Sequence, residues 1–166
     1  MKTNLTLIGM PGAGKSTIGI ILAKNLSMGF IDTDVLIQIN QQKSLQEILD
    51  ESDYLNLRHI EEQEICKLNI SKHVIATGGS AAYSDRAMRH LQTMSTIIFL
   101  KVSYDEIKRR IKNFETRGIA KAEHQSFQEL YDERQELYNR YADITIDCQL
   151  RDQEDIAVEI AQRFII

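Results

Sequence analysis

The sequence is poor in cysteine and proline and has no long apolar run. Its two cysteines, Cys66 and Cys148, are too few for a disulfide framework and have no partner at metal-ligand spacing. We therefore expect reduced thiols and a cytoplasmic protein. No stretch reaches the roughly 20 apolar residues of a membrane-spanning helix, and the first residues lack the layout of a signal peptide. With Pro11 as the single proline, the loops must be shaped by other residues.

The formal net charge of −4 gives the molecule no general attraction for a polyanion. Apolar residues make up 43% and charged residues 27% of the 166 residues, which is typical of one globular domain. One local stretch, 108–121, is basic. We expect a single domain over residues 1–166, a monomer, and neither a nucleic-acid nor a membrane partner.

Short apolar runs alternate with segments of helical period along the whole chain. The expected strands are Leu5–Ile8, Phe30–Ile31, Val74–Ala76, Ile97–Leu100 and Ile144–Ile146. The expected helices are Ser16–Asn25, Ser44–Leu68, Ser84–Gln92, Tyr104–Lys112, Ser126–Tyr141 and Asp155–Phe164. This order predicts an α/β fold with a five-stranded parallel sheet, helices on both faces, and a ligand site at the carboxyl ends of the strands.

The stretch from about 113 to 125 has no strong apolar periodicity and contains Gly118 among basic and small residues. It lies between two expected helices. A loop of about a dozen residues in a compact domain is usually functional or disordered. We therefore interpret it as a mobile lid over a bound nucleotide.

A phosphate-binding loop follows the first expected strand. Residues 9–17 read Gly-Met-Pro-Gly-Ala-Gly-Lys-Ser-Thr and match the G-x-x-x-x-G-K-[ST] pattern at every fixed position. Such a loop turns its backbone N–H groups toward phosphate oxygens, and the next helix adds its positive N-terminal dipole. Lys15 would reach the β- and γ-phosphates and Ser16 would ligate Mg²⁺. The predicted nucleotide contacts are Gly12, Ala13, Gly14, Lys15, Ser16 and Thr17.

Other nucleotide-hydrolysing classes lack support. The sequence has neither an Asn-Lys-x-Asp strand end nor the Asp-x-x-Gly switch of a GTPase, and it is too short for a motor ATPase. We therefore predict an ATP-dependent, Mg²⁺-dependent phosphotransferase that acts on a hydroxyl of a small molecule.

Two carboxylates follow the second expected strand. In an extended chain, Asp32 and Asp34 point to the same side of the backbone, and this strand end lies near the phosphate loop. Asp32 can hold Mg²⁺ directly or through water, and Asp34 can accept a hydrogen bond from the acceptor hydroxyl. The alternative is that Asp34 only caps the helix that follows.

The ordered combination of motifs resembles the shikimate kinase family. Besides the phosphate loop and Asp32-Thr-Asp34, it rests on Arg58 with Glu61, on Thr77-Gly78-Gly79, and on Arg117 in the lid. Glu133-Arg134, leading to Leu137-Tyr138, completes it. The resemblance extends from Gly9 to about Tyr141.

The resemblance implies roles for individual residues. Asp34, Arg58, Gly79 and Arg134 would bind the acceptor, with the two arginines on its carboxylate. Glu61 would hold Arg58 in place from the next helical turn. Arg117 would neutralise charge that builds in the transition state, with Lys15 and Asp34 as the other catalytic residues, and Arg110 would pack against adenine.

The sequence departs from the family pattern at positions that face the acceptor. Ser80 replaces the third glycine after Thr77, Leu57 replaces an aromatic residue, and the lid reads Arg117-Gly118-Ile119 where the family has Arg-Pro-Leu. Ser80 is therefore a candidate substrate contact. Altered contacts of this kind change discrimination by roughly 1–3 kcal/mol each, so the acceptor is shikimate or a similar small hydroxy acid.

Three alternatives stay open from the sequence. The acceptor could belong to a gluconate-type or other small-molecule kinase, because the arginines indicate a carboxylate but not a ring. The chain could be a degenerate, nucleotide-binding regulatory protein, against which the intact Lys15, Ser16, Asp32 and Asp34 argue. A nucleic-acid-binding ATPase is disfavoured by the acidic net charge and by the lack of an aromatic stacking platform.

Overall fold

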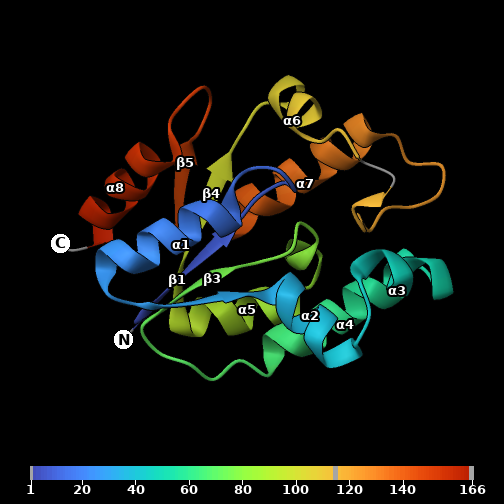
Figure 1. The fold of residues 1–166 in the computed structure, drawn as a ribbon, viewed down its shortest axis with the longest axis horizontal. Helices are drawn as coiled ribbons and strands as arrows, with labels where there is room; N and C mark the ends of the chain where they lie inside the picture. Colours follow the sequence, from blue (N-terminus) through green and yellow to red (C-terminus); the bar gives the residue numbers. More distant parts are fainter. Residues whose placement is uncertain (1, 114–115, 165–166) are drawn as a thin grey trace.

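The computed structural model describes residues 2–113 and 116–164, and it contains the expected five-stranded parallel sheet (Figure 1). The strand order is β2-β3-β1-β4-β5, and every neighbouring pair is parallel. The strands are β1 (Asn4–Ile8), β2 (Gly29–Asp32), β3 (His73–Ala76), β4 (Ser95–Lys101) and β5 (Ile144–Asp147). The predicted fold class and all five strands are confirmed.

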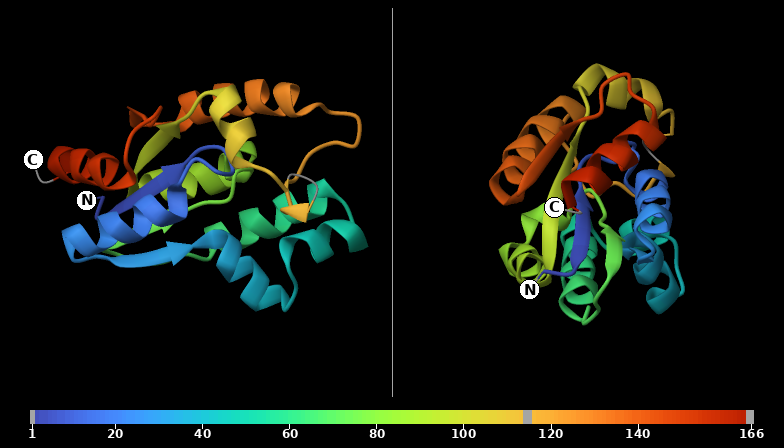
Figure 2. Two further views of the ribbon diagram at one scale, coloured as in Figure 1. Left: turned by 45° about the horizontal axis from the view of Figure 1, so that its top comes forward. Right: turned by 90° about the vertical axis from the view of Figure 1, so that its left-hand side faces the viewer.

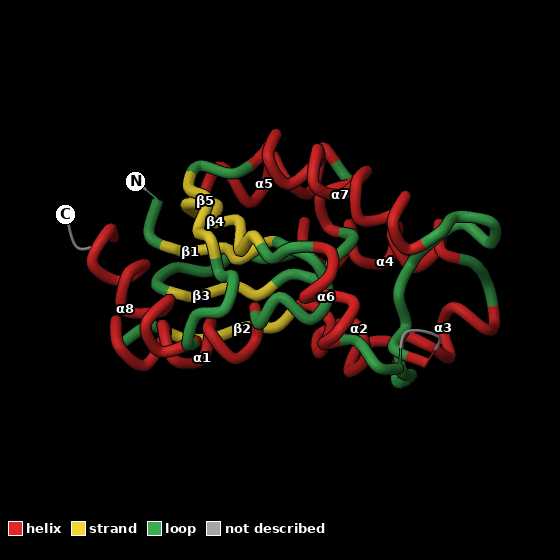
Figure 3. Tube along the Cα trace, turned by 90° about the horizontal axis from the view of Figure 1, so that it is seen from above, coloured by secondary structure: helices red, strands yellow, loops and turns green. Residues whose placement is uncertain are grey.

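Helices cover both faces of the sheet (Figure 3). Helices α1 and α8 pack together on one face, whereas α4, α5 and α7 lie on the other (Figures 2 and 3). The helices are α1 (Lys15–Leu26), α2 (Thr33–Gln41), α3 (Leu45–Glu51), α4 (Tyr54–Cys66), α5 (Asp85–Met94), α6 (Tyr104–Arg110), α7 (Phe127–Tyr141) and α8 (Gln153–Phe164), with a short 3₁₀ helix, η1 (Ala81–Tyr83).

Two helix predictions were wrong. The expected helix Ser44–Leu68 is two helices, because Asp53 caps a new one by accepting a hydrogen bond from the Asn56 N–H at 2.7 Å. Helix α2, which was not predicted, begins directly where β2 ends. Its N-cap is Asp32, whose Oδ1 accepts from the Asp34 N–H at 3.0 Å.

Side chains of both sheet faces form one main apolar core. The central strand β1 is buried along its whole length. A smaller cluster lies beyond the carboxyl end of the sheet, where Ala120 of the expected lid packs against Ile37, Ile48 and Leu57. The lid segment is therefore attached to helices α2, α3 and α4.

Asn4 is a fully buried polar residue that joins three segments of the chain. Its Nδ2 donates to the Ile70 and Met94 carbonyls at 2.9 and 3.2 Å, and its Oδ1 accepts from the His73 N–H at 2.9 Å. The side chain is 0% exposed. Asn4 thus fixes the starts of β1, β3 and β4 relative to one another at the end of the sheet opposite the ligand site.

We predict that Asn4→Ala lowers the free energy of unfolding by roughly 2–4 kcal/mol, because buried backbone groups lose their partners. Denaturant titration measures the change. The control is Asn139→Ala, since Asn139 is exposed and bonds only within its own helix, to the Gln135 carbonyl at 2.8 Å. Equal losses in both variants would show that the Asn4 bridge does not matter.

Candidate active site

The phosphate loop connects β1 to α1 through glycines in the left-handed region. Gly9, Gly12 and Gly14 have φ values of 148°, 81° and 97°, which L side chains rarely adopt. A Cβ on Gly9 would also lie 2.8 Å from the Leu100 carbonyl oxygen. Gly14 is the N-cap of α1, so the loop opens directly onto a helix N-terminus.

Lys15 is folded into the loop. Its Nζ donates to the carbonyls of Gly9 and Met10 at 2.7 and 2.9 Å, and the residue is 8% exposed. Burial lowers the pKa of the ammonium to about 8, an effect that the nearby Asp34 opposes. The cation is therefore held at the centre of the site, against the carbonyls of the loop.

Ser16 and Asp32 form the expected pair of oxygen donors. The Ser16 hydroxyl donates to Asp32 Oδ2 at 2.5 Å, while Asp32 Oδ1 caps α2. The prediction that Asp32 and Asp34 point to the same side of an extended strand was wrong, because β2 ends at Asp32 and Asp34 lies in the first turn of α2. Asp32, and not Asp34, is the helix cap.

Asp34 and Glu61 face each other over Gly78. A Cβ on Gly78 would collide with a carboxylate oxygen of each residue, so any larger residue would push the two carboxylates aside. Burial and the neighbouring Asp32 raise the pKa of Asp34 to about 6. Burial and Asp34 raise the pKa of Glu61 to about 7. The two acids are close and poorly hydrated, which disfavours ionisation of both together.

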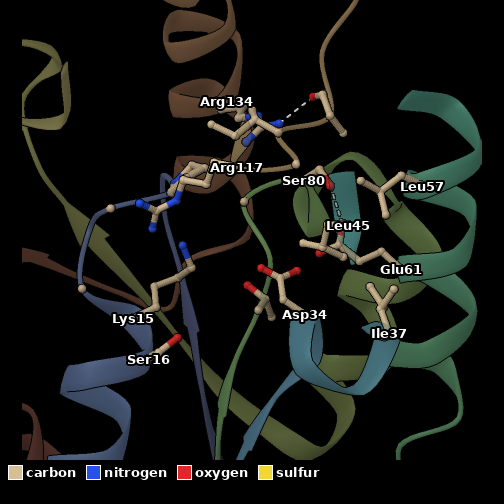
Figure 4. A pocket seen from close by; sticks show the side chains of 18 of the residues that line it. Lys15, Ser16, Asp34, Ile37, Leu45, Leu57, Glu61, Ser80, Arg117 and Arg134 are labelled. Carbon is tan, nitrogen blue, oxygen red and sulfur yellow. Dashed lines mark hydrogen bonds between the residues drawn. The ribbon is translucent and has the colours of Figure 1, made fainter. Parts of the chain in front are cut away.

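Ser80 lies against Glu61 in the cavity wall (Figure 4). Its hydroxyl donates to Glu61 Oε2, whereas Glu61 Oε1 is buried without a hydrogen-bond partner. The expected pairing of Glu61 with Arg58 is therefore corrected: within residues 2–113 and 116–164, Glu61 is bonded to Ser80 and Arg58 has no ion pair. The hydrogen-bond partner of Glu61 is the Ser80 hydroxyl and not the Arg58 guanidinium.

The two arginines assigned to the acceptor carboxylate converge on the lid. Arg58 Nη2 and Arg134 Nη2 both donate to the Ala120 carbonyl, at 3.4 and 2.8 Å. Arg134 is 1% exposed and Arg58 is half-buried. Two guanidinium groups from α4 and α7 thus point at a single oxygen, as they would at a carboxylate.

One cavity of about 320 Å³ unites most of the predicted residues (Figure 4). Lys15, Asp34 and Arg117 share it, and Arg117 lies close to Lys15 in Figure 4. Gly12, Gly14, Ser16, Thr17, Gly79, Ser80 and Arg134 also line it. The cavity thus contains loop, acceptor-side and lid residues together.

Four predicted residues lie outside the lining of this cavity. Asp32 is one of them, and it reaches the site through its hydrogen bond from the lining residue Ser16. Ala13 is buried, and its N–H donates to the Met10 carbonyl at 3.1 Å. Arg110 lies beside the loop, where its Nη1 donates to the Gly12 carbonyl at 3.3 Å. Arg58 lines a neighbouring cavity between α4, the lid and α7.

The sequence analysis missed several apolar and lid residues of the cavity. Ile37 and Leu45 line it from α2 and α3, and the lid contributes the stretch from Gly118 to Ala120. Gly118 has φ 70°, and its N–H donates to Gln46 Oε1 at 3.1 Å. Nothing in the sequence indicates that α2, α3 and the lid lie together at the carboxyl edge of the sheet. Residues 114–115 of the expected lid lie outside the described residues.

Comparisons with known proteins identify the family. A family model described as shikimate kinase matches residues 11–164. A shikimate kinase of Caldanaerobacter subterraneus subsp. tengcongensis is 33% identical over 165 residues, which are 98% of this chain and 96% of that protein. One of Rippkaea orientalis is 38% identical over 163 residues, with coverage of 96% and 86%. The chain belongs to the shikimate kinase family.

The fold agrees with solved shikimate kinases. A structure of the Acinetobacter baumannii enzyme in complex with shikimate has a TM-score of 0.91 at 26% identity, and the match covers 99% of this chain and 94% of that one. The predicted class, an ATP-using kinase, is thereby confirmed. In the described part of the chain, no helix is long and apolar enough to cross a membrane.

We predict that Glu61→Gln stabilises this shikimate kinase family member at pH 8 and has little effect at pH 4. Burial raises the pKa of Glu61 from 4.5 to about 7 in the folded state. The carboxyl is protonated in both states below pH 4.5 and does not destabilise the fold there, whereas above pH 7 its buried charge destabilises the fold fully. The amide can still accept from Ser80. The gain at pH 8 should be about 3 kcal/mol, measured by denaturant titration at both pH values, and a loss of stability at pH 8 would contradict it.

Proposed function

We propose that this chain transfers the γ-phosphoryl group of ATP to a hydroxyl of shikimate. The observation that supports this most is the convergence of Arg58 and Arg134 on one oxygen beside a cavity that also contains Lys15 and Asp34. An acceptor with a carboxylate and a hydroxyl can satisfy both ends of such a site. The solved relative whose complex contains shikimate supports the same acceptor.

On the nucleotide side, the loop from Gly12 to Thr17 holds the phosphates and Lys15 neutralises their charge. Arg110, whose Nη1 donates to the Gly12 carbonyl, would pack against the adenine. Ser16 and Asp32 fit Mg²⁺, because they place two oxygen atoms together and this ion takes few protein ligands, completing its shell with water and phosphate. When bound, Mg²⁺ would supply charge neutralisation at the phosphates.

On the acceptor side, Asp34 accepts a hydrogen bond from the attacking hydroxyl and takes its proton as the bond to phosphorus forms. A base with a pKa of about 6 is ionised at neutral pH and is still basic enough for this task. Arg58 and Arg134 orient the carboxylate, and the backbone at Gly79, between Arg134 and Pro11, sets the position of the acceptor. Arg117 stabilises negative charge on the transferred group.

The alternatives have less support. A gluconate-type acceptor shares the carboxylate, but the matched relatives are shikimate kinases along nearly the whole chain. A degenerate regulatory protein would not need Lys15, Ser16 and Asp34 to line one cavity, with Asp32 bonded to Ser16 beside it. We also propose that residues 1–166 act as one domain and as a monomer, because a single chain supplies every residue of the cavity.

We predict that the wild type releases ADP with shikimate and not with gluconate, quinate or simple polyols, and that Lys15→Ala lowers kcat at least about 100-fold through loss of a charge aimed at the transferred group. The matched control is Lys24→Ala, an exposed lysine on the same helix, which should leave kcat unchanged. A coupled ADP-release assay measures both. Turnover with another acid alone would replace shikimate as the acceptor, and an active Lys15→Ala would refute the kinase mechanism.

We predict that Ser80→Gly changes kcat/KM for shikimate by less than about threefold, or under 1 kcal/mol. The Ser80 O–H donates to Glu61, so it cannot also donate to a group on the acceptor. The comparison variant is the double change with Leu57→Phe, which restores the aromatic wall. A large gain in shikimate use in either variant would indicate that the native site was built for a different acid.

A further inference from the structure

Within the part of the chain that the structure describes, Arg58 forms no ion pair with a carboxylate. Among the described residues its hydrogen bond goes to the Ala120 carbonyl, and its Nε is buried without a partner. Glu61, one helical turn away, is engaged by Ser80. Some other group must therefore hold the guanidinium in the direction in which the structure shows it.

That group is the ring of Tyr83. The Arg58 Cζ atom lies 3.5 Å from the centre of the Tyr83 ring, which is a close stacking distance, and 4.9 Å from that of Tyr54. The face of an aromatic ring carries negative charge density and attracts a guanidinium plane laid over it. The Arg134 Cζ atom lies farther away, 5.6 Å from the centre of the Tyr83 ring, so the close contact of this ring is with Arg58.

Tyr83 is itself held in place. Its hydroxyl donates to Glu133 Oε1, and Glu133 Oε2 accepts from Gln125 Nε2 at 3.3 Å. The Glu133 carboxylate therefore lies near both arginines, which repel each other. The pKa of Arg58 is lowered overall, mainly by burial and also by Arg134, while Tyr83 and Glu133 oppose this shift. Tyr83 ends the 3₁₀ helix η1, which begins directly after Ser80. The segment from Ser80 to Tyr83 thus contains both the hydroxyl that binds Glu61 and the ring that lies against Arg58.

We propose that Tyr83 is the positioning residue for Arg58 and that, together with Glu133, it performs in this chain the task that Glu61 was expected to perform. The ring fixes the plane of the guanidinium so that its Nη2 donor points, with that of Arg134, at one acceptor oxygen. Tyr83 acts through Arg58 and does not take part in the chemical step. The proposal rests on the proposed function, in that the oxygen belongs to an acceptor carboxylate.

The test is a double-mutant cycle. Tyr83→Leu should raise the acceptor KM about tenfold, with kcat and the KM for ATP within about twofold, since only the orientation of one carboxylate contact is lost. In an Arg58→Ala background, Tyr83→Leu should have no further effect, because there is no guanidinium left to position. Tyr83→Phe keeps the ring and should stay within about threefold of the wild type.

The control is Tyr104→Leu. Tyr104 is also half-buried in aromatic contacts, with ring centres 5.6 Å from those of Phe127 and Tyr131, but it does not contact Arg58. It should leave the acceptor KM unchanged. An unchanged KM in Tyr83→Leu, or the same rise in the Arg58→Ala background, would overturn the proposal. A Tyr83→Phe variant as impaired as Tyr83→Leu would assign the effect to the hydroxyl and not to the ring.

A second readout does not depend on activity. In ¹⁵N-labelled protein, the Arg58 side-chain N–H resonance should be shifted by the ring current of Tyr83, retain that shift in Tyr83→Phe, and lose it in Tyr83→Leu. An unshifted resonance in the wild type would refute the stacking. The kinetic experiments use whichever of the tested acceptors (shikimate, gluconate, quinate or a polyol) the wild type phosphorylates. If shikimate is not phosphorylated but another acid is, the proposed function is wrong, and the role of Tyr83 can still be tested with that other acid.

Discussion

Burial of opposite charges at the carboxyl edge of the sheet is the constraint on which the rest of the site depends. Lys15, Glu61 and Arg134 are each less than 10% exposed, and Asp34 lies among them. None of these groups can be ionised there without partners, because desolvation of a lone charge is costly. Lys15 follows β1, and Asp34 lies at the start of α2. Glu61 of α4 and Arg134 of α7 line the same cavity, so each charge lies in the electrostatic field of the others.

The same constraint explains the glycines around the site. Gly78 leaves room for Asp34 and Glu61 to meet, and a Cβ on Gly79 would come within 2.7 Å of both Arg134 Nη1 and Pro11 Cδ. Tyr138 donates to the Gly79 carbonyl at 2.5 Å, which fixes this segment against α7. The phosphate loop and the acceptor side are therefore in direct contact through a backbone that has no side chains to separate them.

The lid is connected to the acceptor side by polar and apolar contacts. Ala120 is buried in the cluster with Ile37, Ile48 and Leu57, and its carbonyl accepts from both arginines. In the proposed function, an acceptor carboxylate would use the same donors. Acceptor and lid would then compete for two guanidinium groups, and Arg117 lies on the same lid segment, three residues before Ala120.

The sequence by itself determined the fold class, the phosphate loop and the residue types of the site. Apolar strand periodicity and a contiguous nine-residue motif are local properties, so they can be read without a structure. The sequence did not determine the break at Asp53 or the helix that begins at Thr33. Both depend on a carboxylate that accepts a hydrogen bond from an N–H two or three residues further along the chain, and apolar periodicity does not show such a cap. Nor did it determine the partner of Arg58. The residues around Arg58 come from three segments: α4 holds 58 and 61, the η1 segment holds 80 and 83, and the lid holds 120. Which of them are in contact is decided only when the fold places these three segments side by side.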